Sequence, residues 1–599
     1  MHNGIAVLDF GGQYAHLIAN RIRRLQVWSE VFPPDVDASA VDGFSGLILS
    51  GGPASVYDPD QPAFNKAHLS SGLPVLGLCY GHQLVCQELG GEVARGDVRE
   101  YGSAKLRIQS ANGLFAGMES PLVVWMSHGD VASRLPAGFE VLGTTDDCAT
   151  AAVGDVRRNL YGLQFHPEVA HTARGMDILD NFLNICAAPR TWTMVGYAET
   201  AMEEIREQVG EKRVFLLVSG GVDSSVAFAL FNRALGPERV LGLHINNGFM
   251  RKCESDRVAD ALRDEGFENL IVEDASEDFL LSVEGMVEPE QKRLAIGRAF
   301  LEIKDRVLDR MGLDSDGWLL GQGTLYPDTI ESGGTEHAAV IKTHHNRVDV
   351  VEELIARGLV IEPLAQLYKD EVRELGNALG LPPHLIWRQP FPGPGLSVRC
   401  LCSPGAGASP PDGKAEEAAR DIAAGAGLGL RVLPLQSVGV QGDFRTYAHP
   451  AVVWGETDWT VLEDVSTRIT NTISWINRVV YLLAPTALPA LKLKRAFLTQ
   501  SRLDLLRDVD ALAMAALERE GLSKTVSQMP TVLLPLTSDG ITETVVLRPV
   551  ETPDFMTARF SALPFDFVRK LARDILNEDG IEAVLYDVTH KPPGTVEWE

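Results

Sequence analysis

The sequence has few cysteines, fewer basic than acidic residues and no long apolar run, and each shortage excludes a class of protein. Its seven cysteines are odd in number and scattered, without paired CxxC motifs, which argues against a disulfide scaffold or a structural zinc site. Lys and Arg number 54 against 81 Asp and Glu, so the net charge of −27 disfavours binding to nucleic acid or to an anionic membrane. No run approaches the ~18 apolar residues of a membrane span. We therefore expect a cytoplasmic protein of ordinary globular composition.

The length of 599 residues predicts about three or four domains. The first residues, MHNGIAVLDFGGQ, lack a basic segment followed by an apolar stretch and a cleavage site, so we expect the first strand of a folded domain there. Short apolar runs that end in glycine-rich turns recur after this strand and again beyond residue 213, as is typical of buried strands in α/β sheets. The predicted class is α/β, with two successive α/β sheet domains followed by an α+β C-terminal domain.

The C-terminal part contains an internal repeat. LPLQSVG at 433–439 is similar to LPLTSDG at 534–540, and INRVVY at 476–481 is similar to IEAVLY at 581–586. Each copy is expected to run strand, strand, helix, strand. A preceding stretch rich in Ala, Gly and Pro shows no clear periodicity and predicts a surface loop or disordered insertion. The expected boundaries are 1–190 and 195–398 for the two α/β domains, 399–429 for a flexible insertion, 430–490 for the first repeat, 491–530 for a helical connector and 531–599 for the second repeat.

A cysteine lies on what is predicted to be a sharp strand-to-helix turn, GLCYG at 77–81. Such a turn exposes a nucleophile while the following helix N-terminus favours its thiolate. In the segment QFHPE, Pro167 forces His166 into an extended conformation, so that Glu168 points the same way and orients the imidazole. The backbone N–H groups of SGGP at 50–53 are candidates to bind an oxyanion. The alternatives are a buried structural cysteine, an ordinary strand-end histidine and a plain turn.

Taken together, DFGGQ, SGGP, GLCYGHQ and QFHPE have the order and spacing that resemble class I glutamine amidotransferases, over about 190 residues. The resemblance implies that Cys79 attacks the side-chain amide of glutamine, with His166 as base and then acid and Glu168 as its orienting group. The products are a glutamyl thioester and ammonia, followed by glutamate. The resemblance also implies a glutamine pocket formed by Gly52, Gln83, Ser127 and His128.

A second chemical motif, SGGVDSS, follows a predicted strand and opens a predicted helix. Glycine backbone N–H groups, serine hydroxyls and the helix dipole all favour an anion there. Asp223 would repel phosphate unless a cation lies between them, so it implies Mg²⁺. The alternative is a generic Gly-Ser helix cap. The candidate ATP-binding residues of the motif are Ser219, Gly220, Gly221, Val222, Asp223, Ser224 and Ser225.

SGGVDSS resembles the signature loop of ATP pyrophosphatases, which split ATP between its α and β phosphates and transfer AMP to an oxygen. Lys369 is a further candidate for ATP binding. Arg293 and the segment with Lys342 and HHN at 344–346 are other expected phosphate partners.

A glutaminase joined to an ATP pyrophosphatase resembles the GMP synthetase family, in its longer form. Further motifs support this: GTLYPD at 323–328, FPGPGL at 391–396, SVGVQGD at 437–443 and KPPGTVEWE at 591–599. The resemblance implies the reaction XMP + ATP + glutamine + water → GMP + AMP + pyrophosphate + glutamate, with Mg²⁺ and a closed path for ammonia. The XMP-binding residues it implies are Arg293, Asp443, Gln528, Lys591 and Glu597.

One position departs from the family pattern. The family usually has Asp-Asn-Gly after its second strand, whereas this chain has Asn246 in place of the acid, which puts nucleotide or metal contacts there in doubt. Two other functions stay open: an adenylating amidase with a different acceptor, and a non-catalytic scaffold of amidotransferase ancestry. Release of AMP and pyrophosphate that depends on XMP would distinguish them.

The repeat also predicts the assembly. Short members of the family dimerise through the C-terminal domain, and two covalently linked copies can pair with each other in the same way. We therefore expect a monomer with an internal pseudo-dimer; the alternative is a homodimer.

Overall fold

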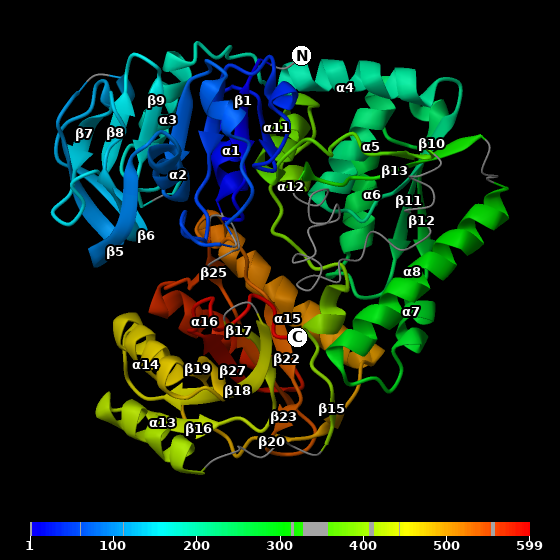
Figure 1. Ribbon diagram of the computed structural model, residues 1–599. Coiled ribbons are helices and arrows are strands. Elements are labelled where there is room, and N and C mark those ends of the chain that lie inside the picture. Colours follow the sequence, from blue (N-terminus) through cyan, green and yellow to red (C-terminus); the bar gives the residue numbers. More distant parts are fainter. Residues whose placement is uncertain are drawn as a thin grey trace. The chain divides into compact units, whose positions relative to one another are not determined.

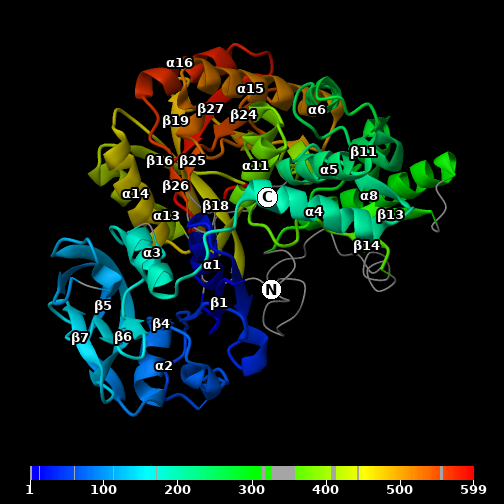
Figure 2. The same ribbon diagram turned by 90° about the horizontal axis from the view of Figure 1, so that it is seen from above.

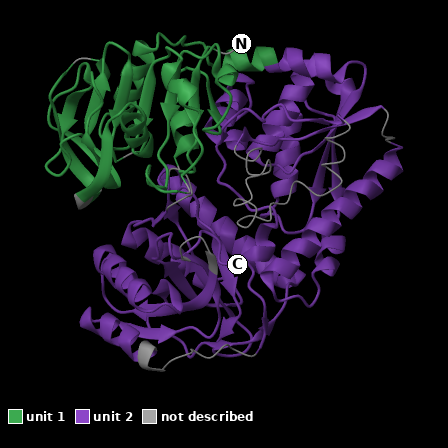
Figure 3. Ribbon diagram, in the orientation of Figure 1, with its two compact units in different colours: residues 1–200 green, residues 201–599 purple. Residues whose placement is uncertain are grey.

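The structure is a computed structural model that divides into two compact units, residues 1–200 and 201–599 (Figure 3). It describes residues 3–12, 14–59, 61–111, 113–169, 171–312, 317–326, 358–405, 413–441, 444–552 and 558–599. Within those ranges, no helix combines the length and apolar character needed to cross a membrane.

The first unit is built on a nine-stranded sheet in the order β2-β1-β3-β4-β9-β8-β7-β5-β6 (Figure 1). Strands β2, β1, β3, β4 and β9 are parallel, and the others are antiparallel. The central strands are buried on both faces, which explains their uninterrupted apolar sequences. The strands are β1 Ile5–Leu8, β2 Ser29–Phe32, β3 Gly46–Leu49, β4 Val75–Leu78, β5 Glu92–Ile108, β6 Leu122–Arg134, β7 Glu140–Thr144, β8 Ala152–Asp155 and β9 Leu160–Leu163. The helices are α1 Ala15–Arg24, α2 Tyr80–Glu88 and α3 Gly175–Ile185, and α4 Met194–Val209 crosses the boundary between the units.

The second unit begins with a parallel five-stranded sheet in the order β12-β11-β10-β13-β14. From β10 the chain first adds strands on one side of the sheet (β11, β12) and then on the other (β13, β14). In open α/β sheets, ligands bind at such a switch point, beyond the carboxyl ends of the strands. SGGVDSS follows β10 and therefore occupies that place. The strands are β10 Arg213–Leu217, β11 Val240–Asn246, β12 Leu270–Asp274, β13 Trp318–Gly321 and β14 Val360–Ile361. The helices are α5 Val222–Leu235, α6 Glu254–Asp264, α7 Ser276–Ser282, α8 Pro289–Met311, α11 Lys369–Ala378 and α12 Pro383–Ile386.

The same unit contains a seven-stranded sheet in which two similar halves meet. In the first half β16 is antiparallel to β18, and α14 joins β18 to the parallel β19; in the second half β22, β24, α16 and β27 repeat this arrangement. The halves join through antiparallel pairing of β19 with β27, as two subunits would across a two-fold axis. The elements are β16 Gly429–Val432, β17 Ser437–Gln441, β18 Phe444–Trp454, α14 Trp459–Thr472, β19 Ile476–Ala484, α15 Gln500–Arg519, β22 Thr531–Leu534, β24 Glu543–Leu547, α16 Phe565–Leu576 and β27 Ile581–Asp587.

Three short antiparallel pairs complete the sheets. They are β15 Ser403–Pro404 with β21 Arg495–Ala496, β20 Lys492–Leu493 with β23 Leu536–Thr537, and β25 Val550–Glu551 with β26 Arg559–Phe560.

The expectation of a flexible insertion at 399–429 is wrong at both ends of this range, since Arg399 and Cys400 at its start are fully buried. Residues 413–425 form helix α13, and Ala419 and Ala423, four residues apart, are fully buried in the hydrophobic core. Alanine has a high helix propensity, and an alanine face needs no large side chain to pack closely. The composition that resembled low complexity therefore encodes a helix.

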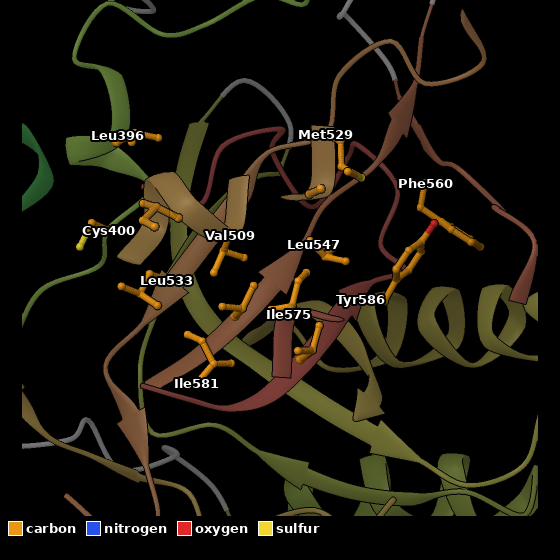
Figure 4. Packing of buried hydrophobic residues seen from close by; sticks show 14 of the residues in the cluster. Leu396, Cys400, Val509, Met529, Leu533, Leu547, Phe560, Ile575, Ile581 and Tyr586 are labelled. Carbon is orange, nitrogen blue, oxygen red and sulfur yellow. The ribbon is translucent and has the colours of Figure 1, made fainter. Parts of the chain in front are cut away.

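A single hydrophobic cluster runs from the five-stranded sheet to the seven-stranded sheet of the second unit. Figure 4 shows its C-terminal part, where Val509 of α15 and Ile575 of α16 lie beside Leu533, Leu547 and other strand residues. Helices α15 and α16 lie along this sheet in both views (Figures 1 and 2). This shared core joins the sheet that carries the SGGVDSS loop and the sheet beside the C-terminal tail in one body.

Candidate active sites

Cys79 lies in a strained turn between β4 and α2. Its φ of 50° and ψ of −102° are unusual for a residue with a side chain, and such strain costs ~1–3 kcal/mol. Helix α2 begins at the next residue, so its N-terminal dipole is directed toward the sulfur. The side chain is almost buried, at 8% exposure. The sharp strand-to-helix turn predicted for GLCYG is therefore present.

His166 and Glu168 form a buried pair after β9. The imidazole Nδ1 lies 2.6 Å from Glu168 Oε1, and the two residues are 4% and 1% exposed. Burial by itself lowers the pKa of His166. The Glu168 carboxylate and a hydrogen bond with Cys79 have a larger, opposite effect, and the pKa is raised to about 10. The backbone N–H of His166 donates to Trp125 O, and its carbonyl accepts from Thr172, so the backbone that carries the ring is held from both sides.

The SGGP turn lies directly beside this pair. A Cβ added at Gly51 would lie 3.2 Å from His166 Cε1 and 3.7 Å from Cys79 Cβ, so a larger residue there would crowd the imidazole ring. The Cys79 thiol lies 3.6 Å from Ser127 O, and Gln164 Nε2 lies 3.8 Å from its sulfur. Gln164 was not predicted as a site residue; its place two residues before His166, on the same side of an extended segment, is the signal that would have found it.

The four predicted glutamine-pocket residues make different contacts. Gln83, on α2, donates from Nε2 to Asp130 O at 2.9 Å and to Gln164 Oε1 at 3.1 Å. His128 is buried and its ring contacts Asp130 O and Glu100. Ser127 contacts Cys79 through its carbonyl oxygen, and Gly52 lies against Phe10 and Tyr80.

The SGGVDSS loop joins β10 to α5, which begins at Val222 within the motif. Gly220 has a φ of 78°, and a Cβ there would lie 2.8 Å from Val258, so the position requires glycine. Ser219 Oγ accepts from Gly221 N and lies 3.1 Å from Ser224 Oγ, whereas Ser225 is buried. The loop therefore presents backbone N–H groups and hydroxyls at a helix N-terminus, the arrangement that binds phosphate.

Lys369 and Asp223 form an ion pair over this loop. Lys369 Nζ lies 2.6 Å from each oxygen of Asp223, and both side chains are partly exposed. Among the described residues no cluster of three His, Cys, Asp or Glu side chains is placed to hold a metal. One carboxylate beside a phosphate loop still fits Mg²⁺, which commonly takes one or two protein carboxylates and completes its shell with phosphate oxygens and water.

The predicted XMP-binding residues that the structure describes lie near the end of the chain or contact its last residues. Glu597 accepts two hydrogen bonds from Arg399, at 3.0 and 2.7 Å, and lies 3.4 Å from Gln528 Nε2. Arg293 donates to the carbonyl of Glu599 at 2.6 Å, and the backbone of Lys591 pairs with Ala558. Asp443, Lys342, the HHN segment at 344–346 and the last two residues of GTLYPD lie outside the described residues.

Comparisons with known proteins identify the family of this chain. Three family models match the chain: glutamine amidotransferase class I at residues 6–186, NAD synthase at 194–295 and the GMP synthase C-terminal domain at 515–598. A GMP synthase (glutamine-hydrolysing) from Heliobacterium modesticaldum is 44% identical over 611 residues, with 100% of this chain and 99% of the relative covered. The chain belongs to the family of glutamine-hydrolysing GMP synthases.

Two further relatives distinguish the forms of the GMP synthase family. The protein of that name from Symbiobacterium thermophilum is 45% identical over 607 residues and is covered, like this chain, to 99%. The one from Listeria monocytogenes (serovar 1/2a) is 42% identical over 500 residues, which cover 95% of that protein but 80% of this chain. The match is therefore end to end with longer members of the family.

The tail of the GMP synthase C-terminal domain is held by both halves of the repeat. Val438 N, in β17, donates to Trp598 O, and Arg478 of β19 donates to Glu597 O at 2.7 Å. Arg478 and Arg548, both fully buried, pair with Asp587 at 2.9 and 3.1 Å. Val438 and Arg478 lie more than 100 positions from the tail residues that they contact, which no local sequence pattern reveals.

The departure at Asn246 has a structural counterpart. Asn246 ends β11, and its Nδ2 donates to Asp274 Oδ1 at 3.2 Å at the end of the neighbouring strand β12. Asp274 is exposed at the carboxyl edge of the sheet. A carboxylate is therefore retained at this edge, one strand away from the family's usual position.

Besides Gln164, two arginines that contact the predicted site residues were not predicted from the sequence. Arg388 donates to the carbonyl of Gly220 in the phosphate loop, and Arg399 binds Glu597 in the tail. Both flank the FPGPGL motif, so their proximity to that motif was the available signal.

Proposed function

We propose that this protein makes GMP from XMP, using glutamine as the nitrogen source and ATP to activate the acceptor. One observation carries the proposal: residues 388–390 contact both the phosphate loop and the tail site. Arg388 donates to Gly220 O, whereas Gln528 donates to Pro390 O at 3.0 Å and lies beside Glu597. A substrate held by Gln528 and Glu597 would therefore lie close to ATP on the loop.

In the glutaminase half, Cys79 attacks the amide carbon of glutamine. His166, already protonated as an imidazolium by the proton of the Cys79 thiol, donates it to the departing ammonia, leaving a glutamyl thioester that water cleaves to glutamate. The buried Glu168 carboxylate stabilises the imidazolium and fixes the ring orientation. The backbone beside Gly51 is the proposed oxyanion site, because a side chain there would contact both His166 and Cys79.

In the synthetase half, the xanthine O2 of XMP attacks the α-phosphorus of ATP and releases pyrophosphate. Ammonia then attacks C2, and AMP leaves with the oxygen. The residues Ser219 to Ser225 hold the phosphates, and Lys369 neutralises charge that develops on them. Mg²⁺ bound by Asp223 and phosphate oxygens would stabilise the leaving pyrophosphate. For this, Lys369 must first give up its ion pair with Asp223.

In the acceptor site, Glu597 and Gln528 are proposed to hydrogen-bond the base or ribose of XMP, and Arg293 and Lys591 to bind its phosphate. Asp443 is proposed to complete the site from the first repeat. Support comes from the fixed Glu597 carboxylate, whose two oxygens are already oriented by Arg399.

The deciding experiment supplies XMP, ATP and Mg²⁺ with either glutamine or ammonia and measures AMP and pyrophosphate. We expect both products only when XMP is present, in a 1:1 ratio with GMP. Equal AMP release with another acceptor, and none with XMP, would show a different adenylating amidase. No AMP with any acceptor would indicate a non-catalytic protein.

For the assembly we propose a cytoplasmic monomer with an internal pseudo-dimer. The antiparallel pairing of β19 with β27 supports this, because it uses within one chain the strand edges that two chains would share. Light scattering at micromolar concentration tests it: a mass near 65.1 kDa is expected, and a stable mass of twice that value would show the homodimer instead.

A further inference from the structure

A continuous series of contacts leads from the phosphate loop into the interior of the second unit. Arg388 donates one guanidinium nitrogen to Gly220 O and another to Glu254. The other oxygen of the Glu254 carboxylate accepts from the backbone N–H of Arg251 at 3.1 Å. The position of the loop carbonyl is thus tied to the position of Arg251.

The series continues through an aromatic ring to the tail. The guanidinium carbons of Arg251 and Arg399 lie 4.9 and 5.1 Å from the centre of the Phe391 ring. Arg251 also lies 3.3 Å from the buried carboxylate of Asp510. Arg399 is fully buried and holds both oxygens of Glu597, at 3.0 and 2.7 Å.

Two physical effects hold this arrangement in place. Arg399 binds the Glu597 carboxylate with a planar two-pronged geometry, which fixes direction as well as distance. Arg399 is fully buried and Phe391 is half-buried, and cation–π attraction strengthens as the partners are removed from water.

We infer that Arg251, Phe391 and Arg399 are positioning residues that couple the nucleotide loop to the acceptor tail. Binding of ATP at the loop fixes Gly220 and, through this series, the direction of the Glu597 carboxylate. Binding of XMP at Glu597 acts on the loop by the same route. The inference rests on the proposed function, since it assigns XMP to the tail and ATP to the loop.

Equilibrium binding to the full-length protein tests this coupling. The dissociation constant of XMP is measured by calorimetry with and without saturating Mg²⁺ and α,β-methylene-ATP, whose α–β bridge resists the cleavage. In the wild type we expect the analogue to tighten XMP binding about 10-fold, within the ~5–150-fold range of such couplings. The analogue's own affinity must rise by the same factor when XMP is present, because coupling free energies are reciprocal.

The key variant is Phe391→Leu, which keeps most of the volume and removes the π face. We expect its XMP affinity without nucleotide to stay close to that of the wild type and its coupling factor to fall to about 1. Phe497→Leu is the matched control, because Phe497 is also half-buried and faces a guanidinium, that of Arg495, at 5.1 Å. Arg399→Lys, which keeps the charge but loses the two-pronged contact, should also reduce the factor.

Different outcomes identify which idea fails. A wild type that does not bind XMP overturns the proposed function and this inference with it. A wild type that binds both nucleotides without coupling, or a Phe391→Leu variant that keeps the full factor, overturns the inference alone. An equal loss of coupling in the Phe497 variant also overturns it, because the effect would then not belong to this series of contacts.

Discussion

Replacing Glu168 by Gln tests how the glutaminase site keeps His166 charged. The pKa of His166 is raised from 6.5 to about 10 although burial lowers it, because the Glu168 carboxylate and a hydrogen bond with Cys79 outweigh burial. This rise corresponds to ~5 kcal/mol in favour of the imidazolium, since one pKa unit is about 1.4 kcal/mol. The substituted amide can still accept the hydrogen bond from Nδ1, but it carries no charge.

The expected change therefore appears in the pH profile. A carboxylate in contact shifts the pKa of its partner by ~1–3 units, so loss of the charge should move the basic limb of kcat/KM for glutamine from near pH 10 to about pH 7–9. Activity at the optimum should fall as well, by roughly 10²–10⁴-fold if the proton transfer is lost completely. The basic limb moves to lower pH because the Glu168 charge raises the pKa of His166 and keeps it protonated at high pH. Without that charge, His166 loses its proton at a lower pH.

The assay is glutamate release by the full-length enzyme with saturating XMP and ATP, from pH 6 to 10.5. The matched control is Glu88→Gln, which makes the same Glu-to-Gln change at another position. Glu88 lies on helix α2 and pairs with Lys66, not with His166. Titration of the substrate amino group affects all the enzymes equally. A basic limb that stays in place in Glu168→Gln, or a uniform loss of activity at every pH, would refute the argument that the carboxylate acts through the charge of His166.

Three further variants test the other parts of the structure. Cys79→Ala should abolish GMP formation from glutamine and leave the ammonia-driven reaction unchanged, whereas Cys86→Ala, in the buried face of the same helix, should affect neither; loss of both reactions in the first variant would contradict separate sites. Asp223→Asn should lower AMP formation by roughly 100-fold or more with either nitrogen source, and near-normal ammonia-dependent activity at ordinary Mg²⁺ would exclude the metal role. Asp587→Asn leaves two fully buried guanidinium groups without their ion pair, which costs ~3–5 kcal/mol. Amide exchange in β27 should therefore accelerate by about 100-fold or more. Exchange as slow as in an Asp260→Asn control, whose ion pair is exposed, would contradict this role of Asp587.

The sequence by itself determined the local shape of three motifs. GLCYG, QFHPE and SGGVDSS each take their backbone conformation from neighbours within a few residues, because a strand end, a glycine or a helix start fixes the local backbone. The Cys79 turn, the His166–Glu168 pair and the start of α5 therefore lie where the motifs predicted them. The order of elements in the repeat was also readable, because hydrophobic periodicity is a local property.

Tertiary structure decided what the motifs could not express. Helix α13 looked like low complexity because its buried face is made of alanine, whose role depends on what packs against it. The Arg399–Glu597 and Arg478–Asp587 pairs join residues more than 100 positions apart, and the chain alone does not show which of its many charges meet. Burial then gives these contacts their weight, since a charge removed from water must find its partner within the fold. The link between the nucleotide loop and the tail consists of such contacts, and it exists only in the folded protein.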